Sequence, residues 1–181
     1  MSDSTTPPAD APGPTRAPAV SVIVPVHLAG STIEACLKSL FSQTLAPARF
    51  EVLLVFHGPD DGARATAQRL STSHGEHGLV FLDSEPASAA SARNVGLDRA
   101  AGDNVTFVDA DGWVSPEYLE ELLAAADGLH VPAAGIADVA PDGTTNDDTP
   151  VMRELARSRA PLVEFHRLRH HSSLSAGKLW P

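Results

Sequence analysis

The chain has 181 residues, of which 43% are hydrophobic, and its formal net charge is -10 at pH 7. This length suits one domain with a real core, and the acidic balance argues against general binding of nucleic acid, which relies on Lys and Arg to neutralise phosphates. A single cysteine, Cys36, excludes an internal disulfide and a multi-cysteine metal site. We expect it to be a small core residue on the apolar face of a helix rather than a nucleophile.

The sequence carries no membrane or export signal of a familiar kind. No apolar run approaches the ~20 residues needed to span a bilayer, and no basic segment followed by an apolar stretch marks a signal peptide. We therefore expect a cytoplasmic protein. Residues 150–181 hold six of the 13 Lys and Arg but two of the 23 Asp and Glu. Such a basic segment predicts either peripheral contact with an anionic inner membrane face or, more commonly, a solvated helix face.

The first predicted elements are a disordered leader, a buried strand and a helix. Residues 1–18 are rich in Pro, Ala, Thr, Ser and Asp, which is typical of disorder. Residues 20–26 are almost wholly apolar and β-branched, as expected for a strand buried on both faces, and Pro25 suits its end. Ser31 and Glu34 match a capping box at the start of the helix that follows.

Alternation of strands and helices continues through the middle of the chain. A second buried strand is predicted over 51–56, and Asp60 or Asp61 can cap the next helix. A short third strand over 79–82 leads to an Ala-rich helix over 87–100. This alternation with short loops predicts an α/β fold with a mostly parallel sheet and helices on both faces.

An apolar strand starting at Val105 ends in Asp109-Ala110-Asp111. Two carboxylates without an adjacent Lys or Arg repel each other, and a hard divalent cation with oxygen ligands would relieve that repulsion. The segment therefore predicts a metal-dependent site for a phosphorylated ligand. The alternative interpretation is a strand followed by an acidic turn.

Three predicted strands end in polar or special residues that the fold would bring together. These ends are 25–27, 56–58 and 109–111, and ligands of such sheets bind at the carboxyl ends of the strands. No Gly-x-Gly-x-x-Gly follows the first strand and no P-loop is present, so the usual dinucleotide and P-loop sites are excluded. Further on, Ser115-Pro116-Glu117 has the features of a helix start, and 130–143 looks like an extended segment with a hairpin turn.

Several segments together resemble family 2 glycosyltransferases with the GT-A fold, a Rossmann-like arrangement. The similarity covers about residues 19 to 140. Its motifs are the strand Val20 to Val26 with a helix ending in Ser39 to Thr44, then Ser91-Ala92-Arg93-Asn94-Val95-Gly96-Leu97, then Gly102 to Asp111, and Trp113 to Leu119. The combination is specific, although each motif alone is not.

The resemblance implies transfer of a sugar from a nucleotide-sugar donor to an acceptor hydroxyl, with inversion at the anomeric carbon. In this family the residue at the position of Asp111 coordinates a divalent cation, Mg²⁺ or Mn²⁺, that bridges the donor diphosphate. Asp109 would contact the ribose or join the metal shell. The acceptor would be a glycan or a polyol phosphate, with a role in cell-surface polysaccharide synthesis by analogy only.

The resemblance also assigns the donor-binding residues. Pro25, Val26 and His27 would line the nucleobase pocket, and Arg93 would reach the donor or support the site from its helix. The alternative for Arg93 is a surface helix charge. Residues 19–149 would then form the nucleotide-sugar-binding core.

One departure from the family pattern concerns base recognition. Family members usually carry an acidic pair after the second strand, and its first carboxylate reads the base. This sequence has Phe56 and His57 there. A carboxylate hydrogen bond to uracil from that position is therefore excluded, which counts against UDP. Phe56 would stack on a base or cap the core.

A second departure concerns catalysis. Residues 175–180 resemble a segment on the acceptor side of the family site, so 150–181 would be the start of the acceptor-side region. The family's catalytic base, a carboxylate, would lie downstream of Pro181, and we expect the chain to be truncated before it. No catalytic residue is assigned. His166 and His170 could form a metal pair, although solvated histidines are the commoner case.

Three functions remain open from the sequence. The first is a glycosyltransferase domain, complete on its donor side and inactive if truncated. The second is a non-catalytic interaction or regulatory module that retains the GT-A fold. The third is a nucleotidyltransferase, for which Leu28-Ala29-Gly30-Ser31 is a poor version of the required glycine-rich, basic loop.

Overall fold

A computed structural model provides the coordinates. The residues that the structure describes are 17–75, 77–128, 131–132, 134, 137–140, 144–146 and 179–180. The sequence predictions for most of the 1–18 leader, for the basic segment apart from its last strand, and for the His166–His170 pair lie outside the described residues.

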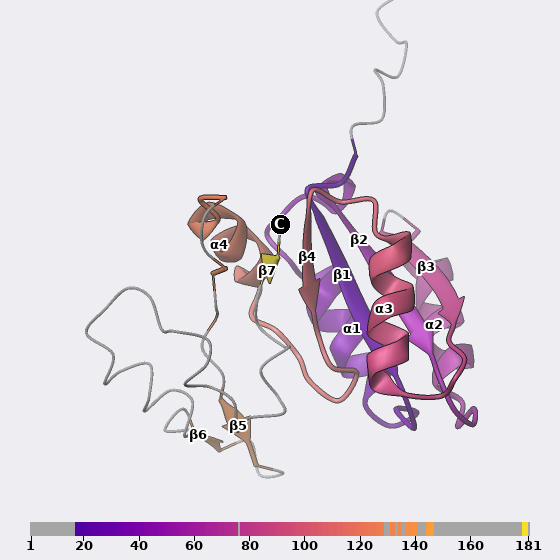
Figure 1. The fold of residues 1–181 in the computed structure, drawn as a ribbon. Coiled ribbons are helices and arrows are strands. Elements are labelled where there is room, and N and C mark those ends of the chain that lie inside the picture. The colour runs from indigo at the N-terminus through magenta and orange to yellow at the C-terminus, as the bar shows by residue number, and fades with distance from the viewer. Residues whose placement is uncertain are drawn as a thin grey trace, which may run out of the picture.

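A five-stranded sheet forms the centre of the molecule (Figure 1). Its strands, in spatial order, are β3 (Gly78–Asp83), β2 (Phe50–Phe56), β1 (Val20–Val26), β4 (Asn104–Phe107) and β7 (Leu179–Trp180). The first four are parallel, and β7 pairs antiparallel with β4. The register aligns Val26 with Phe56 and Phe56 with Asp83, so three strand ends meet at one edge.

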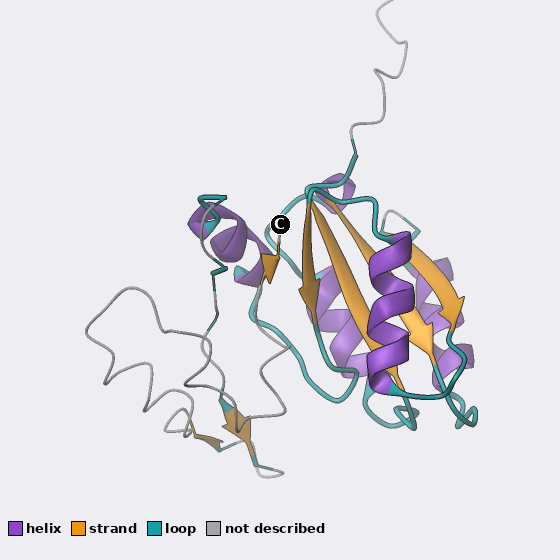
Figure 2. Ribbon diagram, in the orientation of Figure 1, coloured by secondary structure: helices purple, strands orange, loops and turns teal. Residues whose placement is uncertain are grey.

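Helices cover both faces of this sheet, as the alternation predicts (Figure 2). Helices α1 (Ile33–Phe41) and α2 (Ala63–Ser73) lie on one face, and α3 (Ala89–Arg99) lies on the other. The other described elements are the 3-10 helix Pro47–Arg49, helix α4 (Tyr118–Ala125) and an antiparallel pair, β5 (Asp138–Val139) and β6 (Thr145–Asn146). Of the extended segment expected before the turn, the structure shows a strand at Asp138–Val139 only, and the predicted turn residues 141–143 are outside the described residues.

The alternating side chains of β1 and β2 fill two cores, one under each helical layer. Val22 and Val24 belong to the larger core with α1 and α2, whereas Ile23 and Leu53 belong to the smaller core under α3. Because both faces of β1 are buried, its sequence is apolar at nearly every position instead of alternating between apolar and polar residues. Cys36 is fully buried in the larger core, which confirms the expectation for it.

Two predicted helix starts are wrong. Helix α1 begins at Ile33 after Thr32, and no side chain caps it, because the Ala29 carbonyl accepts hydrogen bonds from the amides of Thr32 and Ile33. The Ser31–Glu34 capping box is therefore absent. Helix α4 begins at Tyr118 rather than after Ser115.

The segment before α4 is held by hydrogen bonds from the two residues that follow the C-cap of α1, Gln43 and Thr44. The side-chain amide nitrogen of Gln43 donates to the Ser115 carbonyl over 2.7 Å, and the backbone amide of Thr44 donates to the Pro116 carbonyl over 2.8 Å. Gln43 also accepts a hydrogen bond from the Leu119 amide at 2.9 Å. One glutamine therefore fixes how the chain enters α4 after the acidic motif.

Within the described part of the chain, no helix combines the length and the apolar character required to cross a membrane.

Candidate functional site

The carboxyl ends of β1, β2 and β3 surround an open cleft. Its lining residues come from these strand ends, from the loops after them and from the first turn of α2. They are Val26, Leu28, Phe56, His57, Gly58, Pro59, Asp60, Asp61, Ala63, Arg64, Asp83, Ser84 and Glu85. Of the residues predicted for the base pocket, Val26 and Phe56 line the cleft directly, and Pro25 and His27 flank Val26.

Two histidines form a stacked pair at this edge. The His27 and His57 rings are nearly parallel, with an interplanar angle of 8° and centroids 4.8 Å apart. The His27 Nδ1 atom lies 3.0 Å from the His57 carbonyl oxygen, so the tautomer with a proton on Nδ1 donates to it. Gly58 has φ +81°, and a Cβ atom there would lie 2.8 Å from His27 Nδ1. Glycine is therefore required for the rings to stack.

His57 favours its neutral form. Burial, together with the positive field of the neighbouring His27 and Arg93, lowers the pKa of His57 below its usual 6.5. The residue is 8% exposed, and its Nδ1 atom is buried without a hydrogen-bond partner among the described residues. A buried polar atom in this state is unusual in a folded protein.

Arg93 on α3 links this edge to the acidic motif. Its guanidinium Nη2 donates to Asp109 Oδ1 over 3.0 Å, and the Arg93 side chain is 25% exposed. Its Nε atom is buried and, within the described part of the chain, lacks a partner. Arg93 is therefore an inward-pointing residue, and its interpretation as a solvated surface charge does not fit the structure.

The acidic motif follows β4 at the same edge of the sheet. Strand β4 ends at Phe107, two residues before Asp109, because the chain leaves the ladder after the Val108 amide donates to the Ile23 carbonyl. The Asp109 side chain is 37% exposed, and Asp111 is exposed.

The thiol of Cys36 lies beneath the motif, 3.8 Å from the Asp109 carbonyl oxygen. Burial, with the negative charges of Asp109 and Asp111, raises the pKa of Cys36 to about 12. A thiol held protonated in this way is an inert packing residue.

The donor set of the motif suits a cation that is shared with a ligand. Asp109 is engaged by Arg93, while Asp111 is open to solvent. Among the described residues, no group of three or more His, Cys, Asp or Glu side chains could hold a metal by itself. Mg²⁺ is usually bound by one or two carboxylates together with substrate phosphates and water. These residues fit that mode and not a closed protein cage.

A second cation, Arg64, shapes the other side of the cleft. Its guanidinium carbon lies 4.1 Å from the centroid of the Phe56 ring, and its Nη2 atom donates to Asp83 Oδ1. The Phe81 ring runs parallel to that of Phe56, with centroids 6.1 Å apart. One face of Phe56 is thus covered by Arg64, and the ring also packs against the larger core.

Arg64 and Asp83 were not found from the sequence. Asp83 had a usable signal, because it ends β3 at the same edge as the other strand ends, one residue beyond the predicted strand. Arg64 had none, since it is one of several polar residues on a weakly amphipathic helix.

Asp61, one of the lining residues, is held by hydrogen bonds from the backbone. Asp61 accepts from the Gly30 amide at 2.7 Å and from the Ala63 amide at 3.3 Å, and these bonds lower its pKa. A Cβ atom at Gly30 would lie 2.5 Å from the Asp61 carbonyl oxygen. The expected aspartate N-cap is wrong, because Gly62 holds that position without a side-chain cap. The Asp61 carboxylate nevertheless accepts from the first amide of α2 and fixes the loop after β1.

Comparison with known proteins identifies relatives of one kind. The family model described as Glycosyl transferase family 2 matches residues 21–174. The glycosyltransferase AglE of Haloferax volcanii is 33% identical over 118 residues, which cover 65% of this chain and 38% of AglE. The chain spans well under half the length of the curated relatives it matches.

Solved structures agree with this match. The S. aureus TarS 1-349 structure in complex with UDP has a TM-score of 0.54 at 31% identity, covering 62% of this chain and 33% of that one. Mannosyltransferase PcManGT from Pyrobaculum calidifontis, in complex with GDP-Man and Mn²⁺, has a TM-score of 0.58 at 28% identity, covering 70% of this chain and 38% of that one. The expected GT-A fold is confirmed.

Proposed function

Because the chain belongs to glycosyl transferase family 2, we propose that the carboxyl edge of its sheet binds a nucleoside diphosphate sugar and serves transfer of that sugar to an acceptor hydroxyl. The observation that carries this function is the sharing of one edge by a cleft and an acidic motif. Arg93 joins them, since it is paired with Asp109 and its charge acts on His57 in the cleft.

The acidic motif would serve the diphosphate end of the donor. A divalent cation, Mg²⁺ or Mn²⁺, would be held by Asp111 together with diphosphate oxygens and would neutralise charge on the leaving diphosphate. Asp109, fixed by Arg93, would contact the ribose or complete the cation's shell. The relative PcManGT, described with GDP-Man and Mn²⁺, supports both the donor class and the cation.

The cleft would hold the nucleoside end. Val26 and Phe56 line it, and His27 lies beside them on the stacked histidine pair. Pro25 is the residue before the last in the same strand and would shape the wall behind the base. The orphaned His57 Nδ1 atom offers an unused polar contact there.

The transfer itself would proceed with inversion. The acceptor oxygen attacks the anomeric carbon as the bond from that carbon to the diphosphate oxygen breaks, and the acceptor proton passes to a base. We assign that base to none of the described residues. A glycan or a polyol phosphate would be the acceptor, by analogy with the family only.

Calorimetric titration of a nucleoside diphosphate, with and without Mg²⁺, tests this function. We expect the cation to strengthen binding, and Asp111→Asn to weaken cation-assisted binding by roughly tenfold or more. Asp98→Asn is the matched control, because it removes the same charge from an exposed position on α3. Binding that ignores the cation, or that is unchanged in Asp111→Asn, would contradict the proposal.

An activity assay, rather than a binding assay, distinguishes a glycosyltransferase domain from a non-catalytic module with the same fold. Release of nucleoside diphosphate from a donor sugar, lost in Asp109→Asn, would exclude that alternative. Cation-assisted binding without any turnover by the chain would favour it.

A further inference from the structure

We propose that Arg64 is the stacking surface for the nucleobase, and that the cleft prefers a guanine nucleotide to a uracil nucleotide. This inference rests on the proposed function, because it concerns the nucleoside end of the same cleft. The expected stacking partner of the base is then Arg64, which covers Phe56, rather than Phe56 itself.

Arg64 covers one face of Phe56 and lines the cleft together with it. Its guanidinium lies over the Phe56 ring at 4.1 Å, and its side chain is 29% exposed within the lining of the cleft. A guanidinium is planar and weakly hydrated, and it stacks on aromatic faces. A base approaching this side of the cleft therefore meets the guanidinium before it meets the phenyl ring.

The guanidinium is held from two sides before any ligand arrives. Phe56 lies against one side of it, and the Asp83 carboxylate accepts a hydrogen bond from its edge. Phe56 and Asp83 are direct register partners on neighbouring strands, so the sheet fixes the carboxylate relative to the ring. A side chain positioned in this way loses little further freedom on binding, which favours affinity.

The chemistry of the cleft selects among bases. Among the described residues, its charged lining consists of one cation, Arg64, and several carboxylates, which are Asp60, Asp61, Asp83 and Glu85. An ionised carboxylate only accepts hydrogen bonds. A base suited to this rim must therefore present N–H groups outward.

Guanine meets that requirement better than uracil does. Its ring N–H and its amino group are adjacent donors, and a single carboxylate can accept from both. Uracil presents one N–H between two carbonyl oxygens, which would face the carboxylates unfavourably. Guanine also offers the larger surface for stacking on Arg64.

Titration of the full chain with GDP, ADP and UDP, in the same Mg²⁺ buffer, tests the preference. We expect GDP to bind tightest and UDP weakest, with a ratio of roughly tenfold or more between them. We expect Arg64→Ala to weaken GDP binding by a similar factor and to bring it close to the UDP value.

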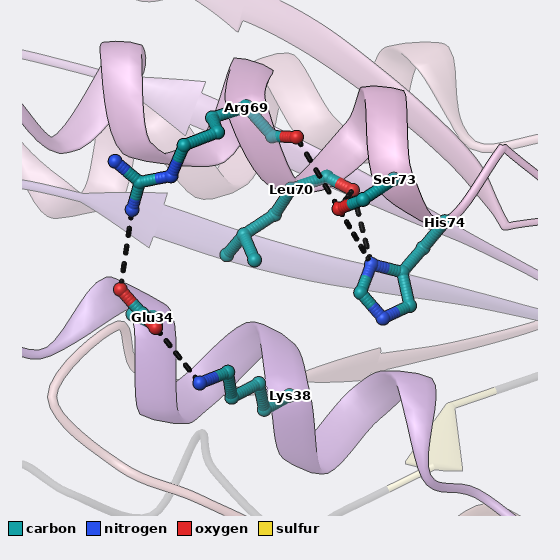
Figure 3. Close-up of polar contacts among 6 residues, drawn as sticks. All are labelled: Glu34, Lys38, Arg69, Leu70, Ser73 and His74. Carbon is teal, nitrogen blue, oxygen red and sulfur yellow. Dashed lines mark hydrogen bonds and ion pairs between the residues drawn. The ribbon is translucent and has the colours of Figure 1, made fainter.

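Two variants separate a flat stacking surface from a simple positive charge. Arg64→Lys keeps the charge but lacks the planar group, so we expect it to lose nearly as much GDP affinity as Arg64→Ala. Arg69→Ala is the matched control on the same helix, because Arg69 pairs with Glu34 of α1, away from the cleft (Figure 3). It should leave all three affinities unchanged, and a thermal melt of each variant checks that it folds.

The outcomes distinguish a failure of this inference from a failure of the proposed function on which it rests. If no nucleoside diphosphate binds the wild-type chain, the proposed function fails and the inference falls with it. If the diphosphates bind but UDP equals or exceeds GDP, the inference alone is overturned. It is likewise overturned if Arg64→Ala or Arg64→Lys retains full GDP affinity.

Discussion

The two ends of the parallel sheet use polar side chains in opposite ways. At the amino end, the buried Ser21 hydroxyl donates to Glu51 over 2.6 Å and accepts from the Gly102 amide at 2.9 Å. The same Glu51 oxygen accepts from the Ala101 amide at 2.7 Å. Every group in this network has a partner within the chain.

The carboxyl end is left incomplete. Within the described part of the chain, His57 Nδ1 and Arg93 Nε are buried there without partners, and Leu28 has a positive φ of 47°. An exposed leucine in the left-handed region is strained, and such strain gathers at functional sites. The contrast teaches that the Ser21–Glu51 network joins strand and loop backbone at the amino end, while the carboxyl end leaves polar atoms of His57 and Arg93 beside the cleft and the acidic motif.

The largest expected effect comes from crowding the amino end. A Cβ atom at Gly102 would lie 2.7 Å from the Ser21 backbone nitrogen, so Gly102→Ala must displace β1. We expect the free energy of unfolding to fall by about 3 kcal/mol. Gly75→Ala is the control, because no atom lies within 4 Å of its Cβ position. Equal denaturation midpoints for the two variants would contradict the close packing described here.

Removing the carboxylate of the amino-end network should cost less. Glu51→Ala leaves the Ala101 amide and the Ser21 hydroxyl without their acceptor, which we expect to lower the free energy of unfolding by about 2 kcal/mol. Glu51→Gln should recover most of this, since an amide oxygen can accept both bonds. Nucleotide affinity should not change in either variant. A change would contradict the view that the amino end of the sheet plays no part in binding.

Relief of strain at the carboxyl end should raise stability slightly. Leu28 is 58% exposed, so little burial is lost in Leu28→Gly. The left-handed conformation costs most residues about 1–2 kcal/mol, and glycine removes this cost. Because glycine also makes the unfolded chain more flexible, part of the benefit is lost, and we expect the free energy of unfolding to rise by about 0.5 kcal/mol. Leu28→Ala keeps the Cβ atom and should show no gain. Chemical denaturation of both variants makes the comparison.

The smallest expected effect is a pH dependence at the carboxyl end. The pKa of His57 is lowered from 6.5 in the folded state, so the unfolded chain binds more protons as the pH falls below 6.5. The stability contributed by neutral His57 is complete above that pH and is lost below it. We expect His57→Gln to flatten the fall in unfolding free energy between pH 7 and 5. Identical pH profiles would show that His57 does not titrate as described.

Much of the fold was predictable because its signals are local. The strands β1 and β2 are apolar apart from Ser21 and Glu51, and the Ala-rich segment does form α3, with Ser88 as its cap. The capping box failed because the Ala29 carbonyl, which sequence cannot place, satisfies the first amides of α1 instead.

The candidate site was predictable only where strand ends carry it. Arg93 and Asp109 were named from motifs, and the structure brings them within 3.0 Å of each other. Arg64 reaches Phe56 from the side of a polar helix, so its role depends on helix packing rather than on any pattern in the chain.

Hydrogen–deuterium exchange with and without GDP and Mg²⁺ tests the central claim most directly, because it reports both ends of the sheet at once. We predict added protection in the loops after β1, β2 and β3 and in the segment from Val108 to Gly112. We predict none around Ser21, Glu51 and Gly102. Protection at the amino end, or none at the carboxyl end at a saturating nucleotide concentration, would contradict this division of the molecule into a closed scaffold and an open site.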